Sequence, residues 1–112
     1  MDIVTETTEW GNIVRVSGCL DVSSRSQLLE LPCIQDCQCP LVLDLAQMDF
    51  LDSSGLGALV QVVRRFREAG KAFVLASPTE TVMRVLELTS VDQIVIIAES
   101  VERAVSVVER SK

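Results

Sequence analysis

The chain has 112 residues, which suits one domain built around a single hydrophobic core. Hydrophobic residues make up 48% of it and charged residues 23%, a composition typical of a globular protein and not of a disordered one. The formal net charge is −6, so we expect repulsion from nucleic acids and anionic lipid surfaces, which argues against both as partners.

The first third of the chain predicts a β-hairpin and a short helix. Residues 3–8 (IVTETT) and 12–18 (NIVRVSG) are rich in β-branched residues and flank a turn that contains Gly11, as hairpin strands do. Residues 20–31 (LDVSSRSQLLEL) predict a short helix, because leucines follow polar residues that can cap it and Pro32 then limits it. The candidate N-caps are Asp21, Ser23 and Ser24.

The middle of the chain predicts a central strand and the best-defined helix. Residues 40–46 (PLVLDLA) form a continuous apolar run with Asp44 inside it, which indicates a strand buried on both faces at the centre of a sheet. From Leu56 onward, apolar residues recur at steps of three and four, and Gly70 predicts the end of this helix. The recurring positions are Leu59, Val60, Val63 and Phe66, while Arg64, Arg65, Arg67 and Glu68 lie on the other side.

The last third predicts strands at residues 71–77 and 93–98, and helices at residues 78–90, opened by Pro78, and 100–110. The predicted order is β-β-α-β-α-β-α-β-α. Alternating strands and helices imply right-handed parallel crossovers, while the opening hairpin adds antiparallel pairing. We therefore expect one α/β domain over residues 1–112, with a mixed, mostly parallel sheet of about five strands and about four helices.

The cysteines suggest no specific chemistry. The chain shows no basic-then-apolar N-terminal segment and no apolar run of membrane-spanning length, so we expect a cytoplasmic protein with reduced thiols and no membrane insertion. Cys33, Cys37, Cys39 and Asp36 could hold a metal, but C-x3-C-x-C matches no common zinc pattern and the sequence has no histidine. We instead expect Cys33 to be partly buried, Cys37 and Cys39 to lie in a polar loop, and Cys19 to be a small core residue.

Residues 52–57 (DSSGLG) connect the central strand to the following helix. Asp52 or Ser53 can cap that helix, while Gly55 and Gly57 allow another backbone to approach closely. Ser54 then lies in the first turn, where a phosphate would meet free N–H groups and the positive end of the helix dipole. This position makes Ser54 a candidate phosphorylation site, with helix capping by the serines as the alternative.

A phosphate on Ser54 would alter the local charge more than the fold. It would add a charge of about −1.5 to −2 beside Asp49, Asp52 and Asp21. Unit charges about 6 Å apart at an effective dielectric of about 20 interact by roughly 3 kcal/mol before salt screening, or about a hundredfold in affinity. We therefore expect phosphorylation to weaken the binding of a partner at this surface.

Catalytic machinery is missing from the motif. Without histidine the chain cannot form a Ser-His-Asp or Cys-His arrangement, and neither Ser53 nor Ser54 has an adjacent lysine. DSSGLG also lacks the first glycine of a G-x-S-x-G elbow, the lysine of a P-loop and the spacing of a dinucleotide fingerprint. We expect a protein that is not an enzyme, and rank direct use of this loop for nucleotide binding or catalysis last.

The predicted element order, with VLDLAQMDFLDSSGLGAL (residues 42–59) at the third strand and second helix, resembles the STAS domain of bacterial anti-sigma factor antagonists. The resemblance covers nearly the whole chain. Its most specific part is D-S-S-G-L-G after an aliphatic strand, supported by VSGCLD (residues 16–21), which is similar to the family's G-x-L-D segment. The resemblance implies a STAS-like fold and a role in signal transduction and transcription regulation.

In that family the second serine of D-S-S-G is phosphorylated by a partner that is both an anti-sigma factor and an ATP-binding serine kinase; by motif it is Ser54. The unphosphorylated antagonist binds this kinase and frees the sigma factor, and the phosphorylated form is released until a serine phosphatase restores it. ATP and Mg²⁺ belong to the kinase, so we expect no cofactor in this chain. The predicted partner-binding residues are Asp21, Asp49, Asp52, Ser53, Gly55, Leu56 and Gly57.

Two features depart from the family pattern. Residues 29–40 (LELPCIQDCQCP) are short and cysteine-rich where a longer helix is usual, and Cys19 replaces a commonly acidic residue. They suggest a divergent regulator. The alternative function is a STAS subunit of a transport or lipid-trafficking complex that docks on an ATPase. An exposed apolar patch around Leu56 and Leu59 could serve a dimer as well as a partner, which leaves the oligomeric state open.

Overall fold

The chain begins with the predicted β-hairpin, seen in a computed structural model that describes residues 1–110. Strand β1 (Asp2–Thr7) pairs antiparallel with β2 (Asn12–Leu20). In the turn, the Thr8 N–H donates to the Gly11 carbonyl at 2.8 Å. Gly11 is required by packing, because a Cβ there would lie 2.2 Å from the Pro40 carbonyl oxygen. The hairpin turn is thereby seated on the segment that leads into the central strand.

Three parallel strands extend the hairpin into one sheet. They are β3 (Leu41–Leu51), β4 (Phe73–Ala76) and β5 (Ile96–Ala98), and the strand order is β1-β2-β3-β4-β5. The pairs β2–β3, β3–β4 and β4–β5 are all parallel. The predicted mixed, mostly parallel sheet of five strands is confirmed, with residues 40–46 in its central strand.

Residues 1–110 contain five α-helices where about four were expected. They are α1 (Arg25–Leu29), α2 (Pro32–Asp36), α3 (Ser53–Ala69), α4 (Glu80–Leu88) and α5 (Val101–Arg110), and a 3₁₀-helix, η1, covers Val91–Gln93. Pro32 limits the first helix as predicted but also begins another, with Leu31 in extended conformation before it. A proline disfavours helical geometry in the residue before it, yet fits the first position of a new helix.

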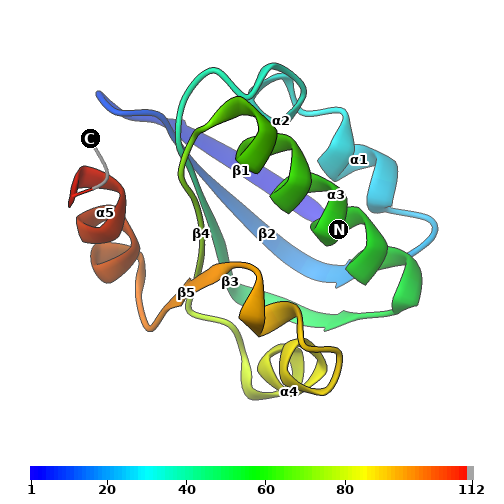
Figure 1. Ribbon diagram of the computed structural model, residues 1–112. Coiled ribbons are helices and arrows are strands. Elements are labelled where there is room, and N and C mark those ends of the chain that lie inside the picture. Colours follow the sequence, from blue (N-terminus) through cyan, green and yellow to red (C-terminus); the bar gives the residue numbers. More distant parts are fainter. Residues whose placement is uncertain (111–112) are drawn as a thin grey trace.

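The helices are divided unequally between the two faces of the sheet (Figure 1). The larger core cluster joins buried residues of α1, α2, α3 and α4 to one face, with Phe66 stacked on Phe73 at 5.3 Å between ring centroids. The smaller cluster joins Ala104 and Val108 of α5 to the other face. The structure therefore packs most of its apolar side chains between the sheet and α1–α4.

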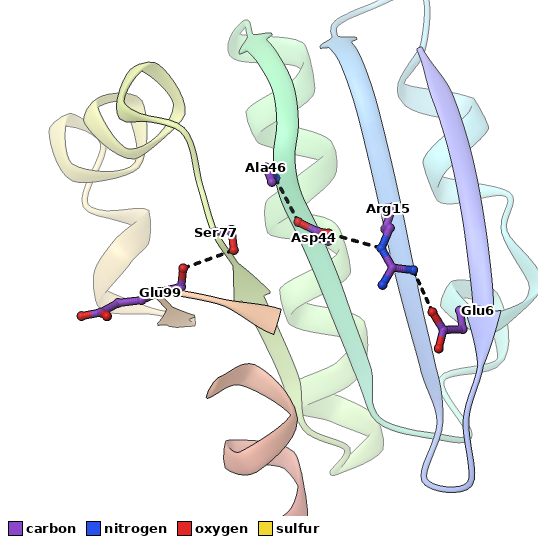
Figure 2. Close-up of polar contacts among 6 residues, drawn as sticks. All are labelled: Glu6, Arg15, Asp44, Ala46, Ser77 and Glu99. Atoms are coloured by element: carbon purple, nitrogen blue, oxygen red, sulfur yellow. Dashed lines mark hydrogen bonds and ion pairs between the residues drawn. The ribbon is translucent and has the colours of Figure 1, made fainter. Parts of the chain in front are cut away.

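Part of the second face carries polar contacts instead of a helix (Figure 2). Arg15 of β2 lies 2.8 Å from the Glu6 carboxylate of β1 and 3.4 Å from the Asp44 carboxylate of β3. Asp44 also accepts a hydrogen bond from the Ala46 N–H at 3.0 Å. Asp44, the acid inside the apolar central strand, thus has an ion-pair partner and a hydrogen-bond donor. These contacts offset the free-energy cost of its partial burial.

The expectations for two cysteines are wrong. Cys19 is exposed, because the β2–β3 register shifts between Gly18 and Cys19 and breaks the regular alternation of the strand. Cys37 is buried at the end of α2, where its backbone is left-handed with φ of 49° and its thiol donates to the Ile34 carbonyl at 2.9 Å. Cys33 is half-buried as expected, Cys39 is exposed, and all four thiols are free.

The aromatic pair in the larger cluster is a sensitive point for stability. We predict that Phe66→Ala lowers the free energy of unfolding by about 3–5 kcal/mol, because it leaves a cavity at a fully buried site. Phe50→Ala is the matched control; Phe50 is 46% exposed, so the loss stays below about 1 kcal/mol. Urea unfolding followed by circular dichroism measures both, and equal losses would contradict the packing described.

Candidate functional site

The candidate site lies where β2 and β3 leave the sheet. Leu20 is paired with Leu51 in the parallel register, so Asp21 and Asp52 are the first residues beyond two neighbouring strand ends. Asp52 then leads directly into α3. The parallel pairing therefore brings two segments together that are 31 residues apart in the sequence, roughly as predicted.

Asp52 caps helix α3. Its backbone is extended, and its carboxylate accepts a hydrogen bond from the Gly55 N–H at 2.8 Å. Ser53 and Ser54 occupy the first two helical positions; Ser53 is exposed and Ser54 half-buried. Within residues 1–110 neither serine hydroxyl makes a hydrogen bond. The alternative in which the serines cap the helix is therefore wrong, and the Ser54 hydroxyl is left available.

Gly55 and Leu20 join the two segments tightly. The Leu20 carbonyl accepts a hydrogen bond from the Asp52 N–H at 3.2 Å. A Cβ on Gly55 would lie 2.1 Å from the same carbonyl oxygen, so a side chain there has no room. The predicted close approach is confirmed for Gly55 but wrong for Gly57, which is exposed with nothing within 4 Å of its Cβ position.

Asp21 organises the turn after β2. Its carboxylate accepts hydrogen bonds from the Ser23 hydroxyl at 2.7 Å, from the Ser23 N–H at 3.0 Å and from both groups of Ser24. These bonds, that of the Ser23 hydroxyl above all, hold the pKa of Asp21 below its ordinary value. The Ser24 hydroxyl shares its one hydrogen between Asp21 and the Cys19 carbonyl, whose oxygen lies at 2.9 Å. The turn beside α3 is thus a defined structure with an ionised acid in it.

The remaining predicted residues of the surface differ in exposure. Asp49 is exposed near the end of β3, and Leu56 is half-buried. Leu59 is only 1% exposed, so the expected apolar patch around Leu56 and Leu59 is wrong. One helical turn separates the two residues, but the buried stripe of α3 includes Leu59.

Two exposed apolar side chains at this edge escaped the sequence analysis. Phe50 is 46% exposed at the end of β3, and Val22 is 71% exposed in the turn after β2. Strand alternation could not have indicated Phe50, because Asp49 and Phe50 are both exposed although successive strand residues point to opposite faces. Val22, in the turn, had no periodic signal either. Both add apolar surface beside the acids.

The cysteine segment forms no candidate metal site. Cys33, Cys37, Cys39 and Asp36 are not brought together as ligands, and no group of three or more His, Cys, Asp or Glu side chains is disposed to hold a metal ion in the described part of the chain. Burial raises the pKa of the Cys33 and Cys37 thiols, which favours their protonated forms. No helix within residues 1–110 is long and apolar enough to cross a membrane.

Comparison with known proteins assigns this arrangement to a family. Residues 2–104 match the STAS domain. The chain belongs to the STAS domain family. A Thermotoga maritima protein classed as an anti-sigma factor antagonist is 37% identical to it over 70 residues. That match covers 62% of this STAS chain and 62% of the relative, so it spans less than two thirds of the relative's length.

Solved structures show the same fold. The crystal structure of an anti-sigma factor antagonist from T. maritima superposes with a TM-score of 0.84 at 24% identity, covering 96% of this chain and 95% of that one. The anti-sigma factor antagonist SpoIIAA in its unphosphorylated form gives 0.72 at 18% identity, with coverage of 97% and 96%. A sulfate transporter family protein from Wolinella succinogenes gives 0.77 at 12% identity, with coverage of 88% and 84%. The STAS fold is thus shared with regulators and with transport proteins.

The two glycines of the motif make a matched pair of substitutions. We predict that Gly55→Ala destabilises the protein by about 1–3 kcal/mol, because the new methyl group must displace the Leu20 backbone. Gly57→Ala should stabilise it by about 0.5–1 kcal/mol, because the site is open and alanine favours the helix. Urea unfolding of both variants tests the contact; two shifts of the same sign would contradict it.

The hydrogen bonds to Asp21 predict its titration. Because the folded state lowers its pKa, Asp21 contributes stability above its unfolded pKa of about 3.9, and this contribution is lost as the pH falls through the folded value. In an NMR titration of the carboxyl carbons, Asp21 should titrate below an ordinary aspartate. Ser23→Ala should move its midpoint upward, since the strongest donor is removed; an unchanged midpoint would argue against that bond.

Proposed function

We propose that this protein is an anti-sigma factor antagonist, or a closely related partner-switching regulator, controlled by reversible phosphorylation of Ser54. In its unphosphorylated form it binds an anti-sigma factor that is also a serine kinase, and phosphorylation releases it. A serine phosphatase then restores the binding form. The observation that carries the proposal is the Ser54 hydroxyl, which is half-buried but unbonded in the first turn of a helix capped by Asp52.

The chemistry divides between the two proteins. The chain supplies the Ser54 hydroxyl, whose oxygen takes the γ-phosphoryl group of ATP while ADP leaves and the proton passes to a base of the kinase. ATP and Mg²⁺ are bound by the kinase, and this chain acts without catalytic activity of its own. Both proteins meet in the bacterial cytoplasm under this proposal.

Under this proposal, a phosphate on Ser54 leaves the fold intact but changes the charge of the surface around it. The backbone N–H groups in the first turn of α3 have no carbonyl partners within the helix. Among them, the Gly55 N–H donates to the Asp52 carboxylate instead. A phosphate on Ser54 can therefore be met by N–H groups and by the positive end of the helix dipole. Its charge is added to a surface that already carries Asp21, Asp49 and Asp52. A partner with carboxylates at this interface is then repelled.

Phosphorylation itself is the first test. Incubation with ATP, Mg²⁺ and the ATP-binding serine kinases of the source organism should place one phosphate on Ser54, located by mass spectrometry. Ser54→Ala should abolish the labelling, and Ser26→Ala, at an exposed serine of α1 outside the predicted partner-binding residues, is the matched control that should keep it. Labelling of Ser53, or of no residue by any active kinase, would overturn the proposal.

Binding is the second test. Ser54→Asp should weaken the complex with the kinase by about a hundredfold, as the charge estimate above gives. Ser54→Ala should bind as tightly as the unmodified protein and should no longer be released by ATP. Isothermal titration calorimetry measures both. Equal affinity of Ser54→Asp and Ser54→Ala for the kinase would contradict the proposed switch.

The shared fold of the W. succinogenes transport protein favours a second candidate. In it, the chain is a STAS subunit of a transport or lipid-trafficking complex, and the edge that carries Phe50 and Val22 docks on an ATPase. Co-purification with a transport ATPase, unaffected by Ser54→Asp, would support this function over the first.

A further inference from the structure

A concave surface lies at the C-terminal end of α3, opposite to the end that carries Ser54. A cleft of about 260 Å³ separates the C-terminal half of this helix from the segment that enters β5. Its apolar wall comprises Val63, Phe66, Ala72, Phe73, Ile94, Val95 and Ile96. The cleft follows the edge of the sheet, because β5 is the last strand and only three residues long.

Exposed apolar side chains border the cleft. Ile96 is 52% exposed and Ile94 is 39% exposed, although both are large aliphatic residues. They lie at and just before β5, whose outer edge has no neighbouring strand within the described sheet. Water-exposed isoleucines next to a hollow and an open strand edge are features of an interaction surface.

Two cations line the same cleft. The Arg67 guanidinium donates one hydrogen bond to the Ile94 carbonyl at 2.9 Å, which leaves its other N–H groups free to bind a ligand. Lys71 is exposed, and neither cation is within ion-pair distance of a carboxylate in residues 1–110. In a chain with a net charge of −6, this apolar cleft is positive. A ligand complementary to this cleft combines an apolar group with a neighbouring negative charge.

The size of the cleft decides between kinds of ligand. Small-molecule sites usually enclose about 300–1,000 Å³ and bury most of the ligand, whereas this cleft is smaller and open. We propose that it binds an extended peptide segment of a partner protein, with an apolar side chain in the cleft and Asp or Glu residues facing Arg67 and Lys71.

This site is separate from the Ser54 surface. Helix α3 has 17 residues, so its two ends are about 25 Å apart. The peptide site does not depend on the proposed phosphorylation, and a phosphate on Ser54 lies beyond the screening length of about 8 Å. One helix would then carry a switch at its first turn and a docking site at its last.

Defined peptides test the proposal. The probe is a blocked eight-residue peptide in which leucine alternates with glutamate, titrated into ¹⁵N-labelled protein. The controls alternate leucine with lysine and serine with glutamate. The leucine–glutamate peptide should shift the amide signals of residues 94–97, Arg67 and Lys71, and should bind at least tenfold more tightly than either control.

Matched variants locate the charge. Lys71→Glu should weaken binding about tenfold, because an exposed attraction becomes a repulsion. Arg64→Glu reverses an exposed charge on helix α3 outside the cleft and should leave binding unchanged. Ser54→Asp should also have no effect, so failure of this site and failure of the phosphorylation switch are distinguishable.

Other outcomes overturn the proposal. Equal binding of the three peptides, or signals shifted elsewhere, would remove the site. Octanoate binding more tightly than the peptide would assign the cleft to a small carboxylate instead. Self-association that Lys71→Glu abolishes would assign it to a second copy of the chain.

Discussion

The site depends on the approach of the Leu20 carbonyl to the first turn of α3. This one oxygen accepts the Asp52 N–H and lies where a side chain of Gly55 would be. The end of β2 is thereby joined to the start of α3, across two strand ends that the parallel register already places side by side. The position of Ser54 relative to Asp21 follows from this contact, so the geometry of the surface is set by backbone atoms and not by flexible side chains.

The Asp52 cap of α3 explains how helix capping and the proposed phosphorylation can use one short motif. A serine that caps a helix through its hydroxyl would lose that bond on modification, and the helix would lose about 1 kcal/mol with it. Here the cap is the Asp52 carboxylate, which cannot be phosphorylated by a serine kinase and stays bonded to Gly55. The hydroxyl of Ser54 is consequently free of a structural role, which a reversible modification requires.

The sheet, α3 and the location of the DSSGLG motif could be predicted from the sequence, because they depend on periodicity and turn chemistry. The sequence was insufficient where one residue changes the backbone locally. The register shift beside Gly18 exposes Cys19, and the left-handed end of α2 buries Cys37; neither has a periodic signal. Gly55 and Gly57 look alike in the sequence, and only the position of the Leu20 carbonyl distinguishes them.

The distribution of charge along α3 supports a switch that acts on partners and not on folding. An acid, Asp52, caps α3 and further acids lie in the adjoining segments, while Arg64, Arg65, Arg67 and Lys71 lie in its C-terminal half and just beyond it. Negative charge near the N-terminus of a helix and positive charge near its C-terminus both interact favourably with the helix dipole and so stabilise the helix. A phosphate on Ser54 has the sign that the dipole favours, while it increases the repulsion among neighbouring acids. These two effects act in opposite directions on the folded state, whereas on a partner's carboxylates only the repulsion acts. Binding is therefore the property that the proposed phosphorylation would change most.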